Sequence, residues 1–270
     1  MSRKQLCWTL GFVVVVMVCG GGCMSVHFLP QEQVELAAIG VDELTLARLN
    51  GEADPPEDGP QPHRLEGRLV VVHAWSLEQR DRFGWWGMAQ LNPSRRSIAT
   101  LSALPGVEYA WQVELADYFA DQEQDRREQA RLAGLEYEPN QSPINLPETL
   151  RAIAHDQDAD LVLFVTSGTS ARDFDAGLVI AQVLTLGLAP TVVINADATM
   201  TAVLLDAETG YAYAITQTEG DGFEMSSGWT RESNKRDQAR VAVAEAFDQV
   251  VDRLEAAWPQ MQASYRGNQP

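Results

Sequence analysis

The chain has 270 residues, 38 acidic and 20 basic, which gives a formal net charge of −18 at pH 7. A surface this negative repels phosphate backbones, so nucleic acid is not an expected partner. The three cysteines all lie within the first 23 residues. The sequence therefore excludes a disulfide framework, a thiolate zinc site or a cysteine nucleophile from the rest of the chain.

The N-terminus has the three parts of an export signal. Met1–Lys4 is basic, Leu6–Val18 is apolar and uncharged, and three glycines lead into Cys23. Such an order is typical of a secretory signal peptide, and the cysteine after the cut resembles a bacterial lipoprotein signal. We predict that residues 1–22 are removed and that Cys23 receives the lipid.

The residues after Cys23 bear on the membrane that holds the chain. Met24 and Ser25 lack the aspartate that often retains lipoproteins in the inner membrane, which favours the outer membrane with the domain facing the periplasm. Two or more acyl chains give stable anchoring. Residues 23–67 are predicted to be the lipidated N-terminus and a flexible tether, because Gly51–His63 is rich in Pro, Gly and acidic residues. A short helix is expected within Val34–Leu49.

The folded domain is predicted to span residues 68–258. Leu69–Trp75 is a short β-branched run, typical of a strand covered on both faces. The next helix is expected to have Asn92 as its cap and Pro93 in its first turn, with Ile98, Leu101 and Leu104 on its inner face.

The middle of the chain alternates between further candidate elements. Val107–Leu115 fits a strand or a helix, and its dense β-formers favour the strand. Asp121–Arg131 is expected to be a solvated helix or loop. Pro147–Thr149 opens another helix, with Leu150, Ile153 and Ala154 inward, and Leu161–Val165 is predicted to be a buried strand.

Residues Ala176–Ala196 carry no charge. That length could nearly span a bilayer, but Gln182, Pro190 and Asn195 interrupt it, so a short apolar helix or loop followed by a strand is expected. Thr191–Leu205 then alternates apolar and polar residues, which predicts a strand with one wet face and antiparallel neighbours.

A long hairpin over about residues 191–218 is predicted, with Asp206–Gly210 as its turn. The last helix is expected over Ser233–Trp258, ended by Pro259 and followed by a polar tail, 259–270. Its apolar stripe comprises Val243, Phe247, Val250, Val251, Leu254 and Trp258. The whole predicts an α/β (α+β) single domain with a mixed sheet flanked by helices.

Three stretches carry a resemblance to a known family: Ala159–Leu163, Leu184–Pro190 and Asp206–Tyr211. Over Leu150–Leu254 the chain resembles the rhombotarget lipoprotein family. More broadly, it is similar to the α/β domain of curli-secretion lipoproteins, of the Tol-Pal periplasmic protein's N-terminal part, and of penicillin-binding-protein activators. The resemblance implies envelope residence and assembly roles. It supplies no catalytic residue.

Candidate chemistry is sparse. Gly168–Arg172 faintly resembles a nucleophile elbow, but a polar loop after a strand is the preferred interpretation. The four histidines, His27, His63, His73 and His155, have no metal-ligand spacing. No metal and no cofactor are expected.

Four aspartates form a separate candidate group. Asp158 and Asp160 could gather with Asp173 and Asp175 around strand ends and bind a hard cation such as calcium, although solvated turns explain them more simply.

Phe83–Met88 places two tryptophans beside glycines. Aromatic residues and methionine are enriched at interaction surfaces, so Trp85, Trp86 and Met88 are candidate partner-binding residues. In the simpler alternative, one tryptophan packs in the core and the other covers a loop.

Three functions compete. The leading hypothesis is a lipid-anchored envelope protein that binds another protein and catalyses no reaction. A self-assembling structural or channel-type lipoprotein, forming homo-oligomers through Ala176–Ala196, is the first alternative. A hydrolase using Asp160, Asp173, Asp175 and Ser170 is the second.

Overall fold

The structure, a computed structural model, describes residues 65–75, 91–137, 145–175, 190–227 and 230–266, together with Thr45, Ala47 and Leu49. Its elements in chain order are β1 (Gly67–Trp75), α4 (Arg95–Ala103), β2 (Val107–Glu114), α5 (Leu115–Ala133), α6 (Leu146–Asp156), β3 (Leu161–Asp175), β4 (Pro190–Asp206), β5 (Ala212–Ser227) and α8 (Arg231–Arg266).

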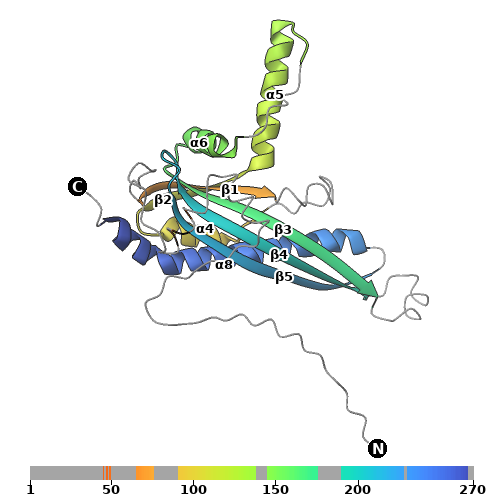
Figure 1. Ribbon diagram of the computed structural model, residues 1–270. Coiled ribbons are helices and arrows are strands. Elements are labelled where there is room, and N and C mark those ends of the chain that lie inside the picture. Colours follow the sequence, from red (N-terminus) through yellow and green to blue (C-terminus); the bar gives the residue numbers. More distant parts are fainter. Residues whose placement is uncertain are drawn as a thin grey trace, which may run out of the picture.

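The centre of the fold is a five-stranded sheet in the order β2-β1-β3-β4-β5 (Figure 1). Strand β1 lies parallel to both β2 and β3, and β3, β4 and β5 follow one another antiparallel. The predicted mixed α/β domain, with its long hairpin and long C-terminal helix, is confirmed. The hairpin is longer than expected because β5 continues to Ser227.

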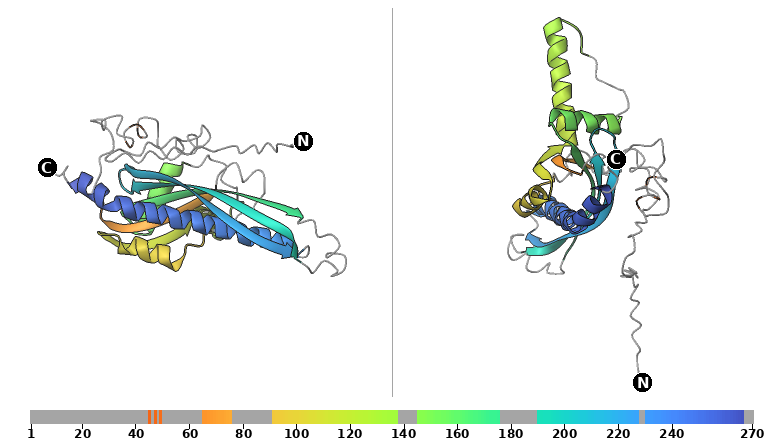
Figure 2. Two further views of the ribbon diagram at one scale, coloured as in Figure 1. Left: turned by 90° about the horizontal axis from the view of Figure 1, so that it is seen from below. Right: turned by 90° about the vertical axis from the view of Figure 1, so that its left-hand side faces the viewer.

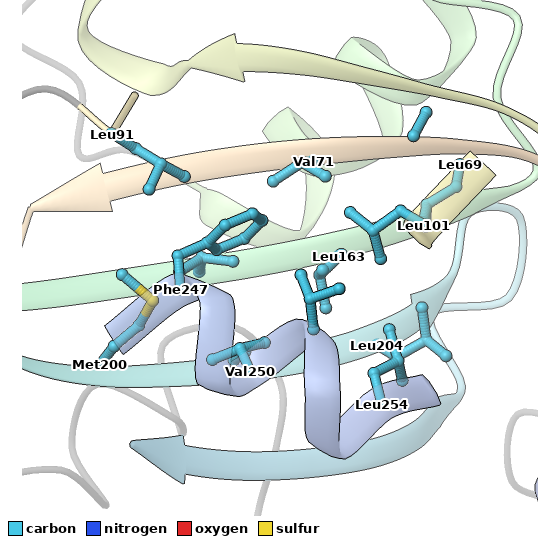
Figure 3. Close-up of a cluster of buried hydrophobic side chains, with 14 of the residues drawn as sticks. Leu69, Val71, Leu91, Leu101, Leu163, Met200, Leu204, Phe247, Val250 and Leu254 are labelled. Carbon is cyan, nitrogen blue, oxygen red and sulfur yellow. The ribbon is translucent and has the colours of Figure 1, made fainter. Parts of the chain in front are cut away.

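One face of the sheet is covered by α8 and α4 (Figure 2). Along β4 the side chains from Ile194 to Ala202 alternate between buried and more exposed positions, as predicted for a strand with one wet face. From Ala202 to Leu205 both faces of the strand are buried. The α8 stripe predicted from Val243 to Trp258 is buried against this face, and Figure 3 shows Phe247, Val250 and Leu254 beside Leu163 and Leu204. This is the main hydrophobic core.

The opposite face is covered near β1 and β3 by α6. Leu150, Ile153 and Ala154 point inward as predicted and pack on Val70, Val72, Val162 and Phe164. Leu49 packs against the same cluster, and it is helical together with Thr45 and Ala47. No helix in the described ranges is long and apolar enough to cross a membrane.

Four local predictions are wrong, and three of them concern β3 and α4. Strand β3 continues to Asp175, so Gly168–Arg172 is a paired strand and not a polar loop. Helix α4 is capped by Ser94, whose hydroxyl accepts from the Ser97 amide, rather than by Asn92, and Ile98 is exposed. The inward face of α4 consists of Ser97 and Leu101, four residues apart, and Ile98 lies beside this face.

Pro259 does not end the last helix, because α8 runs through it to Arg266. Trp258 Nε1 and Gln262 Nε2 both donate to the carbonyl oxygen of Pro105, at 2.8 and 2.6 Å. Met261 is buried in the core and Tyr265 packs against it. These contacts on both sides of Pro259 offset the hydrogen bond that a proline removes from a helix.

Candidate functional site

The residues predicted to bind lipid or a partner lie outside the described residues. This holds for Cys23, Trp85, Trp86 and Met88, and also for His27 and His63. Their roles stay predictions from sequence.

The four aspartates of the cation and hydrolase hypotheses do not gather. Asp158 and Asp160 precede β3, whereas Asp173 and Asp175 belong to its last residues. The strand residues 161–172 lie between the two pairs and separate them by about 40 Å. Asp160 is structural: its carboxylate accepts from the Arg68 amide at 2.9 Å. Ser170 stands part-way along the strand, 3.5 Å from an Asp197 carboxylate oxygen.

The structure does assemble a polar cluster that the sequence analysis missed. His73 of β1 is fully buried between Glu114 of β2 and Ser167 of β3. Its Nδ1 lies 2.7 Å from Glu114 Oε2, and its Nε2 lies 2.8 Å from Ser167 Oγ. Gln112 Nε2 donates to the other Glu114 oxygen at 2.9 Å and to the Leu91 carbonyl at 2.7 Å.

Strand pairing explains why these residues meet. His73 is in register with Glu114, and Trp75 with Ser167, so all three side chains leave neighbouring strands on one face. A sheet order of 2-1-3-4-5 changes direction between β1 and β3, and α/β sheets often bind ligands at the carboxyl ends of strands at such a point. Sequence reasoning missed the cluster because it treated the chain around Ser167 as a loop.

A serine, a histidine and a carboxylate at these distances have the arrangement of a nucleophile with its base and orienting group. Here, however, Ser167 is only 1% exposed. It stands inside β3, paired with Trp75 on one side and Met200 on the other, so its backbone groups lie within the sheet ladder. Acyl transfer needs an open nucleophile and free donors for the developing oxyanion. The cluster therefore fits a structural role. We call His73, Glu114 and Ser167 the His73 clasp, because their hydrogen bonds join β1, β2 and β3.

In the parts of the chain that are described, no three His, Cys, Asp or Glu side chains come together. His155 is exposed at the end of α6, and its nearest ion-pair neighbour is the adjacent Asp156.

Helix α5 is the most unusual surface feature. It stands away from the sheet (Figure 1), and none of its 19 residues is buried. Only its first turns touch the domain, where Leu115 and Tyr118 pack against the second cluster. At its far end Leu132 and Leu135 are 72% and 69% exposed.

Local pairs help to hold α5 in helical form. Arg126 pairs with Glu123 and Arg131 with Glu128, each three residues apart, and the Arg127 guanidinium lies 5.1 Å from the centre of the Tyr137 ring. Such pairs contribute only about 0.2–0.5 kcal/mol each. Most helical stability in proteins comes from packing of an apolar face, and α5 has such packing only in its first turns.

A smaller apolar surface lies on the wet face of the hairpin. Phe223 and Met225 of β5 are 68% and 46% exposed, and Met225 is paired with Val193 of β4. This end of the sheet is distant from α5 (Figure 1).

No family model matches the sequence, and neither does any curated protein. Among solved structures, a Caulobacter crescentus protein assigned as a lipoprotein has 19% identity and a TM-score of 0.28, over 42% of this chain and 80% of that one. Lipoprotein GNA1162 of Neisseria meningitidis has 12% identity and a TM-score of 0.28, over 71% and 99%. PelC of Paraburkholderia phytofirmans, solved as a dodecamer, has 16% identity and a TM-score of 0.26, over 70% and 91%. At TM-scores this low, function has to be argued from this chain's own residues.

Proposed function

We propose that this protein is a lipid-anchored lipoprotein of the bacterial cell envelope with a non-catalytic protein-binding or assembly role. The anchor is Cys23, and the body faces the periplasm from the outer membrane. The single observation that carries the binding role is α5, a 19-residue helix with no buried side chain.

The binding role is inferred from the small contribution that α5 makes to the hydrophobic cores. Its shaft buries no side chain in either hydrophobic cluster beyond its first turns, so the core does not need it. An ordered helix that is solvated on all sides stabilises nothing by burial. Its exposed Leu132, with Leu135 just beyond the helix end, instead provides an apolar anchor of the kind that protein interfaces cover.

The non-catalytic part of the proposal rests on the His73 clasp. The one cluster with the composition of a hydrolytic site among the described residues has its serine sealed inside the sheet. The aspartates of the hydrolase hypothesis lie at opposite ends of β3.

Photo-crosslinking in intact cells tests the binding role. A photoreactive amino acid at Leu132 should capture a specific neighbour, because this side chain lies at the tip of α5. The matched control places the photoreactive amino acid at position 240 instead, where Arg240 is exposed on α8. It should not capture that neighbour. Repeated failure at Leu132, Leu135 and Gln129, with the chain at normal abundance, would contradict the role.

The anchor is tested separately. Mass spectrometry of the native chain should find acyl groups on an N-terminal Cys23, and Cys23→Ser should move the chain out of the membrane fraction. An intact Met1 on the membrane-bound protein would contradict lipidation.

A second candidate is a self-assembling structural or channel-type lipoprotein. The exposed Phe223 and Met225 favour it, because they stand at the same end of the sheet as the β4 part of the uncharged segment Ala176–Ala196. Light scattering of the full chain in detergent should then show a defined oligomer that Phe223→Ser with Met225→Ser dissociates. A strictly monomeric chain would exclude this candidate.

A further inference from the structure

Side chains of α8 cover the middle of the outer edge of β5. In the sheet, β5 is an edge strand, with β4 as its neighbour on one side. In an antiparallel pair every second residue directs its backbone groups away from the partner strand. In the middle of β5 these are Gln217, Glu219 and Asp221, and each of them meets a side chain of α8.

The three contacts form a regular ladder. Arg253 donates to the Gln217 carbonyl, Gln249 Nε2 donates to the Glu219 carbonyl at 2.7 Å, and the Asp221 amide donates to Glu245 Oε2 at 3.1 Å. Two α8 side chains thus donate to strand carbonyls and the third accepts from a strand amide, so each suits the backbone group that it meets.

Helix and strand spacings explain why the ladder stays in register. Glu245, Gln249 and Arg253 are four residues apart, which is about 6 Å along a helix. Their partners on β5 are two residues apart, which is about 6.7 Å along a strand. Because the two elements run antiparallel, each step along α8 reaches the next outward-facing residue of β5.

Close approach of the two backbones makes the ladder possible. A Cβ built on Gly220 would lie 2.1 Å from the Ala242 carbonyl oxygen, and one on Gly222 would lie 2.5 Å from that of Gln238. Thr218 Oγ1 donates to the Ala246 carbonyl at 2.7 Å. With no side chains between them, α8 lies against β5, and its polar side chains can bend over the edge.

We propose that this ladder is an autoinhibitory contact: α8 occupies the β5 edge and keeps a strand of a second copy of this chain from adding to it. An open edge of sixteen residues is a template for strand addition. A second copy is the occupant because it carries the same edge, and antiparallel pairing of identical edges closes across a two-fold axis. This inference does not depend on the binding role of α5 or on the lipid.

The test is the triple variant Glu245→Ala, Gln249→Ala, Arg253→Ala in the purified full chain. The Asp221 amide should exchange with solvent about tenfold faster, which corresponds to loss of one hydrogen bond to a charged group. Light scattering should show concentration-dependent self-association beyond that of the parent chain. The acidic Glu219 and Asp221 repel their counterparts in such a pair, so salt should strengthen it.

Two further variants decide between strand addition and general loss of structure. Asp237→Ala, Arg240→Ala, Gln260→Ala removes one acid, one arginine and one glutamine from exposed positions of α8, and it should behave as the parent. Adding Glu219→Pro to the first triple variant should reverse the association, because it deletes an outward N–H while the bonds to β4 remain. The proposal is overturned if the triple variant behaves as the parent, or if it associates equally well with proline at position 219 or in the control triple.

Discussion

Gly220 of β5 lies directly beneath the carbonyl oxygen of Ala242 in α8, so close that a Cβ would stand 2.1 Å from it. The obstructing atom is helix backbone, which cannot move aside as a flexible side chain would. The longest helix of the fold is thereby held against the edge strand of the sheet.

Gly220→Ala should therefore destabilise the domain by about 3 kcal/mol, the range for overpacking against a rigid neighbour. Chemical denaturation measures it. Gly134→Ala is the matched control: it adds the same methyl group where nothing lies within 4 Å, and its cost should be only the positive-φ strain, about 1 kcal/mol. Equal effects at the two glycines would contradict close packing of α8 on β5.

His73→Ala should cost about 2–3 kcal/mol, because it leaves the Glu114 carboxylate and the Ser167 hydroxyl without their shared partner in a buried place. Ser167→Ala should cost less, about 1 kcal/mol. A double-mutant cycle of the two would measure the coupling. The clasp interpretation also expects no labelling of Ser167 by a fluorophosphonate, and stoichiometric labelling there would contradict it.

The Tyr213 hydroxyl donates to Asp206 Oδ2 at 2.9 Å in the hairpin turn. Burial raises the pKa of Tyr213, and the neighbouring Asp206 carboxylate raises it further. The folded pKa lies above the unfolded value near 10, so the stabilisation is complete below about pH 10 and is lost as the pH rises beyond it. Tyr213→Phe should make the alkaline loss of unfolding free energy shallower than in the parent. Identical slopes above pH 10 would contradict this assignment.

Patterns that repeat along one element were predictable from sequence. The α8 stripe from Val243 to Trp258 is set by helix periodicity, and the β4 alternation is set by a sheet with one wet face. The turn needs positive φ at Gly210, and it has φ +74°. In each case the local backbone geometry and the burial of the side chains favour the same structure, so one segment of sequence was enough to predict it.

The structural features that were not predicted from the sequence depend on contacts between distant segments. The second half of β3 is rich in small and polar residues, and nothing local distinguishes it from a loop. Beyond Ser167 its strand partner is β4, which comes later in the sequence. Pro259 signals a helix end, yet Pro105, more than 150 residues away, provides the hydrogen bonds that carry the helix past it. The His73 clasp needs the register of three strands at once, which no single segment encodes.

Gln124→Pro should melt the solvated part of α5 while leaving the domain fold intact. Proline in a helix interior costs about 3 kcal/mol, but the cost stays local because no α5 side chain is buried. Circular dichroism should lose helical signal with no shift in the midpoint of global unfolding, and crosslinking from Leu132 should disappear. A large drop in the global midpoint would mean that α5 stabilises the core.

Truncation after Trp258 should destabilise the domain by about 2–4 kcal/mol, although the sequence marks the following residues as a polar tail. The deletion removes the buried Met261, the Gln262 side chain that donates to Pro105, and the Tyr265 ring, which stacks edge-on against Tyr213 with centres 5.0 Å apart. Loss of Met261 and Tyr265 exposes part of the core, and loss of Gln262 leaves the Pro105 carbonyl oxygen with one donor fewer. Truncation after Arg266 is the control and should leave the unfolding midpoint unchanged. If both truncations unfold at the parent midpoint, the helix beyond Pro259 contributes nothing to the fold.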